Sequence, residues 1–521
     1  MASGPPALIR GGREADDDAG PLSHARLRET FAELGLETDA IDPVLATLAP
    51  DAGQDAEAVA AALCAALAEP LRARIAARAP LPEHASTSDP AWFPLPAPAR
   101  PGPRARTRRH RALPRLVRWL LAHGARFPSV ALVVTPDGSA RVRAIAPIPA
   151  GGELLFIPHA AFITPRTDLP EHMALAARLL EEGEDPASPW RPYLDALPLE
   201  PPDLPLFYPP TSLALLRGSL CLWRLAAQRR GLAAEYCTLV DHHPALRRFG
   251  FSQYVAARTT VTSRVFALGA AQTLVPMADL LDHAVACEAS WSHDEARGGV
   301  VMHATTDIAP GTEVHDSYGA KCNSRFLVSY GFCLPDNPDN HAALFLPPPR
   351  HDPRVDLLAR LLWRHPIGSV RRLEVTSRYR DPATRRLFSY LRLACASDDE
   401  YTAIAAHGRL QRGEIGPISA RNERAALDAL AAAAALALRR FPTTLEEDAH
   451  RLAQPDLPRR ARTALLMCQG EKRVLAALLA LTREATSYLH ERPHELAAHA
   501  REMAADGSPL ADYLNGLAFE G

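Results

Sequence analysis

The chain has 521 residues, of which 47% are hydrophobic and 23% are charged, and its formal net charge at pH 7 is −2. A chain of this length can bury a large core and is typical of two or three domains. The near-zero charge excludes a whole-protein field that would attract nucleic acid or a membrane surface, and no apolar run is long enough to span a bilayer. We therefore expect neither a membrane nor a specific nucleic acid as partner.

The cysteines and the first residues indicate an intracellular protein. The 8 cysteines are scattered without a Cys-x-x-Cys pair, which is typical of reduced thiols and predicts no metal site. Residues 1–20 have no apolar signal core, and their acidic run argues against a transit peptide. The expected compartment is the cytoplasm or the nucleus, with a plastid left open. Basic charge is almost entirely arginine, because Lys321 and Lys472 are the only lysines.

Residues 1–79 are predicted to form a helical N-terminal extension, because apolar residues recur there at three- and four-residue spacing. Residues 80–112 are interpreted as a linker rich in proline and arginine, which ends in the basic cluster Arg104–Arg111. We interpret this cluster as solvated linker, and a nuclear signal or a phosphate-binding patch are the alternatives. Neither segment shows a pattern that indicates chemistry.

A pattern typical of a mixed helix and strand domain begins at Leu113. The segment LPRLVRWLLAHGA is amphipathic, and its Gly124 suits the C-terminal cap of a helix. The segments SVALVVTP, ARVRAIAPI and PAGGELLFIP predict three short strands, the first two joined by a turn at residues 136–138.

Residues 165–250 are predicted to be helical and are interrupted by prolines. We interpret Trp190 and Tyr193, in the segment SPWRPYLDALP, as core residues, since large aromatic side chains are usually buried. This helical region is expected to form one wall of a substrate cleft.

The stretch from Thr262 to Phe332 carries the polar and aromatic residues that indicate a site. It reads TSRVFAL, then LVPMADLLDH, then TTDIAPGTEVHDSYGAKCNSRFLVSYGF. An apolar run ends on the acid–histidine pair Asp282-His283, and Tyr318 follows a short alternating segment. Short strands that end on such residues are expected to line an aromatic-walled channel beside a polar ligand cleft.

The remainder of the chain is predicted to contain only helices. Residues 353–500 include long segments with an apolar stripe at helical spacing. Thr444 and Glu447 stand at capping-box spacing at the start of one of these helices. Residues 501–521 are predicted to be a C-terminal tail.

The ordered motifs SRVF, VPMADLLDH, DSYGAKCN and YGF resemble those of the SET-domain methyltransferases, in the branch of the Rubisco large-subunit methyltransferase. The resemblance covers roughly residues 113–485. It implies an α+β fold, in which a SET domain of short strands spans 113–347 with a helical insertion at about 165–250, followed by an all-α substrate-binding domain at 353–500. Members of this branch transfer a methyl group from S-adenosylmethionine to lysine of non-histone proteins, and a subgroup methylates histidine of actin.

The resemblance also assigns roles to individual residues. Tyr318 corresponds to the tyrosine beside the transferred methyl group, and Phe266 and Tyr330 to residues that line the substrate channel. Residues assigned to the cofactor are Glu153, Leu154, Arg264, Asp279, Asp282, His283 and Tyr318. Among these, Arg264 is expected to bind the cofactor carboxylate, Asp282 its amino group and His283 its adenine. Asp279 is expected to brace the loop through backbone hydrogen bonds.

Two positions depart from the family pattern. Ser139, Ala140 and Arg141 stand where the family has a Gly-x-Gly whose bare backbone approaches the cofactor. Asp282 replaces an asparagine; a carboxylate can also accept from an ammonium group, with added Coulomb attraction.

The residues therefore predict a protein-lysine N-methyltransferase that acts as a monomer on a protein substrate. No strong general base is required, because a nearby sulfonium and an apolar channel lower the pKa of the target amine. The aromatic Phe266 and the small Ala278 favour lysine, since the histidine-methylating subgroup has an amide and a tryptophan at these positions. A SET-like scaffold that binds proteins without catalysis is the first alternative, and histidine methylation is the second.

Overall fold

The computed structural model describes residues 103–135, 139–165, 169–197, 203–269, 271–346, 372–406, 415–490, 493–504 and 509–517. These residues all belong to one compact unit, Pro90–Gly521. The predicted helical extension at 1–79 and most of the predicted linker lie outside the described residues. No helix in the described ranges is both long enough and apolar enough to cross a membrane.

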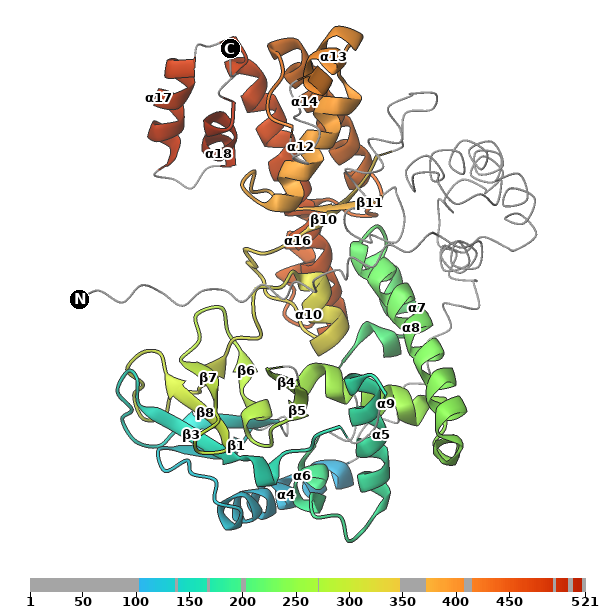
Figure 1. Cartoon of the computed structure of the whole chain (residues 1–521), viewed down its shortest axis with the longest axis vertical. Coiled ribbons are helices and arrows are strands. Elements are labelled where there is room, and N and C mark those ends of the chain that lie inside the picture. Colours follow the sequence, from blue (N-terminus) through green and yellow to red (C-terminus); the bar gives the residue numbers. More distant parts are fainter. Residues whose placement is uncertain are drawn as a thin grey trace, which may run out of the picture. The chain divides into compact units, whose positions relative to one another are not determined.

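The N-terminal half of the described chain is built from short strands in small sheets (Figure 1). The antiparallel strands β1 (Val130–Val134) and β2 (Ala140–Ala144) form the predicted hairpin. A three-stranded sheet has the order β3-β8-β7, with β3 Glu153–Pro158, β7 Ala289–Asp294 and β8 Gly299–Ala304. Two further pairs are the antiparallel β4 (Val265–Leu268) with β5 (Ala271–Leu274) and the parallel β6 (Asp282–His283) with β9 (His315–Asp316).

Helix α4 (Pro103–Ala122) begins earlier than the sequence predicted. The predicted linker ended at residue 112, but helical backbone already covers the basic cluster. Arginine and leucine are good helix formers, and the helix continues through Pro114, which lies inside it. The basic cluster is therefore helical rather than part of an irregular linker.

The insertion is helical, as predicted, and its last helix ends beyond residue 250. Its helices are α5 (Glu171–Glu184), α6 (Arg191–Ala196), α7 (Pro210–Leu213), α8 (Leu220–His242) and α9 (Phe251–Arg264). Helix α9 ends at Arg264, directly before strand β4, so the end of the insertion positions the SRVF motif.

A helical second domain follows helix α10 (Asn323–Tyr330) and strand β10 (Ala342–Phe345). Its helices are α12 (Pro382–Ala394), α13 (Asp398–Ala406), α14 (Ala420–Leu438), α15 (Leu445–Leu452), α16 (Arg459–Tyr488), α17 (Pro493–Ala504) and α18 (Pro509–Asn515). The capping box at α15 is confirmed: Glu447 N donates to Thr444 Oγ1 at 3.2 Å, and Thr444 N donates to Glu447 Oε2 at 2.8 Å.

Two expectations about this domain were wrong. Strand β11 (Arg372–Val375) lies inside the region predicted to be all helical and pairs with β10. Residues 501–521, predicted as a tail, contain α18, whose Tyr513 is buried and donates to Glu423 of α14 at 2.7 Å. Both elements are too short to show a clear period in the sequence, and long-range pairing and packing stabilise them.

A glycine of the helical insertion packs closely against the backbone of the second domain. Gly218 has φ +89°, and a Cβ there would lie 2.7 Å from the carbonyl oxygen of Arg440. We expect Gly218→Ala to lower the free energy of unfolding by about 1–3 kcal/mol, because the residue would be both strained and in collision. Gly183→Ala is the control: nothing lies near its Cβ in α5, and alanine should stabilise the helix by about 0.5–1 kcal/mol. Equal effects in urea denaturation would contradict this.

Candidate active site

The parallel pair β6–β9 brings the predicted acid–histidine motif beside the predicted tyrosine. Asp282 is in register with His315, and His283 with Asp316. Tyr318 lies two residues beyond the end of β9, and its backbone N–H donates to His283 Nδ1 at 3.1 Å. Since Nδ1 accepts this bond, the neutral imidazole carries its proton on Nε2. Burial lowers the pKa of His283, which favours this neutral form.

Tyr318 is held by two ring contacts and at its hydroxyl. Its ring stacks on His283 with a centroid distance of 5.3 Å and on Tyr330 with a centroid distance of 4.8 Å. The hydroxyl donates to the carbonyl oxygen of Leu281 at 2.8 Å. Burial raises the pKa of Tyr318, so the phenol stays protonated near neutral pH. Because the hydroxyl proton is donated to Leu281, the oxygen is free only to accept a further hydrogen bond. The side chain is not a phenolate and so cannot act as a strong base.

Two phenylalanines complete the aromatic group. Phe326 of α10 lies 4.8 Å from His283 between ring centroids, and Phe332 stacks on Phe326 at 5.0 Å. Helix α10 ends at Gly331, which has φ 82° and serves as a left-handed C-cap. This turn places Tyr330 and Phe332 on either side of the cap and beside the same aromatic group.

Arg264 and Asp279 form a buried ion pair next to this group. Arg264 Nη1 donates to both the carbonyl oxygen and Oδ2 of Asp279, each at 2.9 Å. Tyr193 donates its hydroxyl proton to the same Oδ2 at 2.9 Å. Asp279 therefore braces the loop with its side chain as well as through the predicted backbone bonds. Tyr193 is a core residue, as interpreted from the sequence, but it also orients this carboxylate.

The remaining polar groups of this pair suit the amino-acid end of the expected cofactor. Asp279 Oδ1 is buried and has no hydrogen-bond partner. The Nε and Nη2 groups of Arg264 make no hydrogen bond within the described part of the chain. A guanidinium with free donors binds a carboxylate, and an unsatisfied carboxylate oxygen binds an ammonium. The residues present therefore fit the zwitterionic end of S-adenosylmethionine.

The two departures from the family pattern contact each other. Arg141 of β2 lies 3.1 Å from Asp282 Oδ2 through Nη2 and 3.1 Å from Glu313 Oε1 through Nε. Asp282 thus does not stand as an isolated charge, and its Oδ1 remains without a partner among the described residues. The sequence showed each departure alone; only the fold shows that one charge offsets the other.

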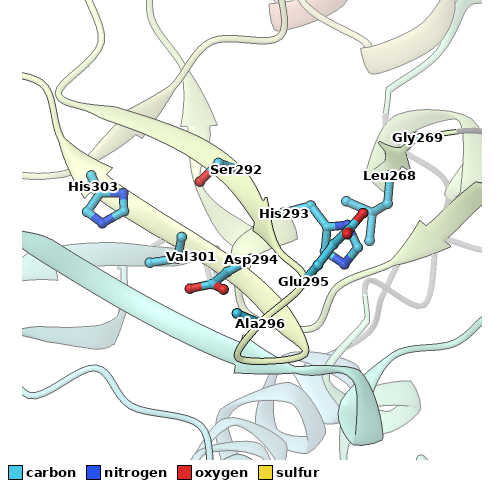
Figure 2. Close-up of a pocket in the computed structure, with 9 residues that line it drawn as sticks. All are labelled: Leu268, Gly269, Ser292, His293, Asp294, Glu295, Ala296, Val301 and His303. Carbon is cyan, nitrogen blue, oxygen red and sulfur yellow. The ribbon is translucent and has the colours of Figure 1, made fainter.

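Phe266 of β4 lies two residues before Leu268, which lines a pocket of about 900 Å³. Phe266 is 8% exposed and meets Trp291 edge to face, with ring centroids 5.2 Å apart. Figure 2 shows the pocket, which is lined by Leu268 and Gly269 and by residues of β7, β8 and the turn between them. Its polar lining includes Asp294, Glu295 and His303. None of the residues that the resemblance assigns to the cofactor lines this pocket.

Glu153 and Leu154 are not linked to Tyr318 by any contact of the described residues. Glu153 accepts from Arg297 at 2.6 Å and 3.1 Å, and this bond lowers the pKa of its carboxyl. Leu154 is buried at an irregularity in the β3–β8 pairing. Their predicted contacts to the cofactor are backbone contacts, so the engaged side chain of Glu153 is compatible with that role, which stays a prediction.

Two contributors were missed or undervalued in the sequence: Arg141 and Trp291. Trp291 lies on strand β7. Only the pairing of that strand shows that this aromatic residue stands beside the site motifs.

The described residues contain no group of three His, Cys, Asp or Glu side chains placed to hold a metal ion. Met277, which precedes Ala278, has φ 73°, a strained conformation that the buried loop around Asp279 maintains.

Asp316 gives the site a pH-dependent stability. Burial raises its pKa to about 6, above the usual value of ~3.9 for an unfolded chain. The folded state therefore binds the proton more tightly, so the contribution to stability is complete below about pH 4 and is lost as pH rises through about 6. We expect Asp316→Asn to flatten the fall in unfolding free energy over this range. An unchanged pH slope in urea titrations would contradict the assignment.

The fold and the site together define a class of protein. The described chain has a SET fold followed by a helical domain, and the family model of the Rubisco LSMT substrate-binding domain matches residues 349–475. The solved SET domain of LSMT bound to lysine and AdoHcy is similar with a TM-score of 0.63 and 21% identity, covering 79% of this chain and 99% of that one. Rubisco LSMT bound to AdoMet is similar with a TM-score of 0.61, covering 73% and 93%.

The predicted resemblance is thus confirmed: the chain has the fold of the solved SET domain of LSMT, and residues 349–475 match the Rubisco LSMT substrate-binding model. The curated relatives are named for histidine methylation of actin and not for Rubisco. The actin-histidine N-methyltransferase of Xenopus tropicalis is 26% identical over 406 residues, which cover 70% of this chain and 69% of that protein. The protein of that name from Homo sapiens is 25% identical over 403 residues, covering 70% and 67%.

Proposed function

We propose that the chain is a protein-lysine N-methyltransferase that uses S-adenosylmethionine and acts on a non-histone protein. Methyl transfer to a protein is supported by the relatives and solved structures above, which are protein methyltransferases or bind AdoMet or AdoHcy. The observation that carries the proposal is the placement of Tyr318, whose ring stacks on His283 and on Tyr330 and whose hydroxyl donates its proton to the carbonyl oxygen of Leu281.

The residues of this site bind and orient rather than remove protons. S-adenosylmethionine supplies an activated methyl group on a sulfonium. Arg264 and Asp279 would hold its carboxylate and ammonium ends, with Asp282 as a further acceptor. The Tyr318 oxygen accepts a hydrogen bond from the target nitrogen and so aims its lone pair. The aromatic walls exclude water, which lowers the pKa of a lysine from its usual ~10.4 and favours the neutral amine.

The choice of lysine rests on the walls of the channel. Phe266 is fixed against Trp291 and presents no donor or acceptor to a target side chain. An apolar aromatic wall suits the aliphatic stem of lysine, whereas an imidazole requires a polar partner to fix one ring nitrogen. Ala278 is buried and small, whereas the histidine-methylating subgroup is expected to have a tryptophan at this position.

Histidine methylation is the second candidate, because the curated relatives are named actin-histidine N-methyltransferases. This observation ranks histidine above the non-catalytic scaffold that the sequence first suggested as the alternative.

The test is incubation of the purified chain with methyl-labelled S-adenosylmethionine and a cell lysate, followed by mass spectrometry of the modified residue. We expect the label on lysine of a lysate protein. Label on histidine would replace the first candidate by the second. Absence of labelling, together with no heat of binding when millimolar S-adenosylmethionine is titrated into the chain, would leave the scaffold.

A further inference from the structure

The chain's own lysines differ sharply in their surroundings. Lys321 and Lys472 are the only lysines of the whole sequence. The side chain of Lys472 is 2% exposed, lies 2.6 Å from Asp448 Oδ2 and also donates to Thr443 Oγ1 at 2.9 Å. It is therefore neutralised and enclosed, as a structural buried lysine should be.

Lys321, by contrast, lies beside Tyr318 and Tyr330 of the candidate active site. Its Nζ donates to the backbone carbonyl oxygen of Tyr318 and lies 6.0 Å from the ring centroid of Tyr330. A Cβ on Gly319 would be 3.3 Å from this Nζ, so the side chain folds back over the turn instead of extending outward. No carboxylate pairs with it within the described part of the chain, where Lys472 has Asp448.

We propose that Lys321 is a methyl-acceptor site of the chain itself, modified by the same machinery as the protein substrate. The proposal rests on the proposed function, because it needs the bound methyl donor. The amine is half-buried on a flexible four-carbon stem, and it already contacts the backbone of Tyr318.

The state of the amine suits this reaction. Burial lowers the pKa of Lys321, and the nearby positive charge of Arg325 lowers it further. Both effects raise the neutral fraction near physiological pH. In the transfer, the Nζ lone pair forms a bond to the sulfonium methyl, the C–S bond breaks with its electrons passing to sulfur, and S-adenosylhomocysteine leaves. The methylated ammonium then releases one proton to water.

The first experiment uses the full chain with methyl-labelled S-adenosylmethionine and no other protein. We expect peptide mapping to find the label on Lys321, at a rate per molecule that does not change with protein concentration, because the transfer is intramolecular. Lys321→Arg keeps the positive charge but cannot accept the methyl, and its labelling should fall to background. Lys472 serves as an internal control and should stay unlabelled.

A second readout does not depend on catalysis. The chain without cofactor is treated with an amine-acylating reagent near neutral pH, and modification of each lysine is followed by mass spectrometry. We expect Lys321 to be acylated faster than Lys472 by at least about tenfold, and S-adenosylhomocysteine to slow the acylation of Lys321. Acylation of Lys321 that the added S-adenosylhomocysteine leaves unchanged would place the amine outside the site and overturn the proposal.

Two negative results are distinguishable. A preparation that labels a lysate protein but not Lys321 would overturn self-methylation and leave the proposed function standing. A preparation that labels neither, and gives no heat with S-adenosylmethionine, would remove both. Label on a residue other than Lys321 would also reject the site proposed here.

Discussion

Replacing Tyr318 by phenylalanine is expected to reduce turnover by about 10²–10³-fold while the chain remains folded. The ring and its stacking on His283 and Tyr330 are kept, so the aromatic layer should persist. The variant loses only the oxygen that orients the target nitrogen and its bond to Leu281, which costs about 1 kcal/mol of stability. The measurement is initial-rate methylation of the protein substrate, with circular dichroism to verify the fold.

Tyr236→Phe is a matched control for this prediction. Tyr236 in α8 donates its hydroxyl proton to the carbonyl oxygen of Phe249 at 2.7 Å, the same type of bond that Tyr318 makes. We expect a similar loss of stability and no large change in turnover. If both variants turn over substrate like the unmodified chain, Tyr318 does not have the orienting role assigned to it.

The largest expected effect on stability is in the second domain, at Arg392. This side chain is 3% exposed and donates to both oxygens of Glu423, at 2.8 Å from Nε and 2.7 Å from Nη2. Arg392→Met should lower the free energy of unfolding by about 3–5 kcal/mol, because it leaves the carboxylate of Glu423 buried without its counter-charge. Urea denaturation of the two chains measures the difference.

An exposed arginine of the same domain is the matched comparison. Arg421 pairs with Glu400, but its side chain is 56% exposed, so water screens the charges. Arg421→Met should therefore cost less than about 1 kcal/mol. If Arg392→Met lowered the free energy of unfolding by as little as Arg421→Met, the carboxylate of Glu423 would have to be neutralised by a proton or solvated by water. The ion pair would then not be what holds α12 to α14.

The order of motifs along the chain was sufficient to predict the class of fold and the central tyrosine. The apolar run LVPMADLLDH was predicted to end on a polar pair beside a cleft, and the structure places His283 of that pair against Tyr318. The capping box of α15 was also predictable, since Thr444 and Glu447 satisfy backbone groups of their own turn. Such features depend on residues close in sequence.

Elements whose stability comes from distant partners were not predictable in this way. Strands β6 and β9 have two residues each, too few for any period, and they exist because Asp282 and His283 pair in parallel with residues far along the chain. Strand β11 and helix α18 were missed for the same reason.

By itself, the sequence determined which residue types were available: an aromatic layer, an arginine and acids for a zwitterion, and a chain almost free of lysine. Only the tertiary structure decided which of them meet. In the fold, Arg141 forms an ion pair with Asp282, Tyr193 donates a hydrogen bond to Asp279, and Lys321 donates one to the backbone of Tyr318. These contacts are set by how separate elements pack, and the energy of an ion pair or hydrogen bond depends on distance and burial, which no local pattern encodes.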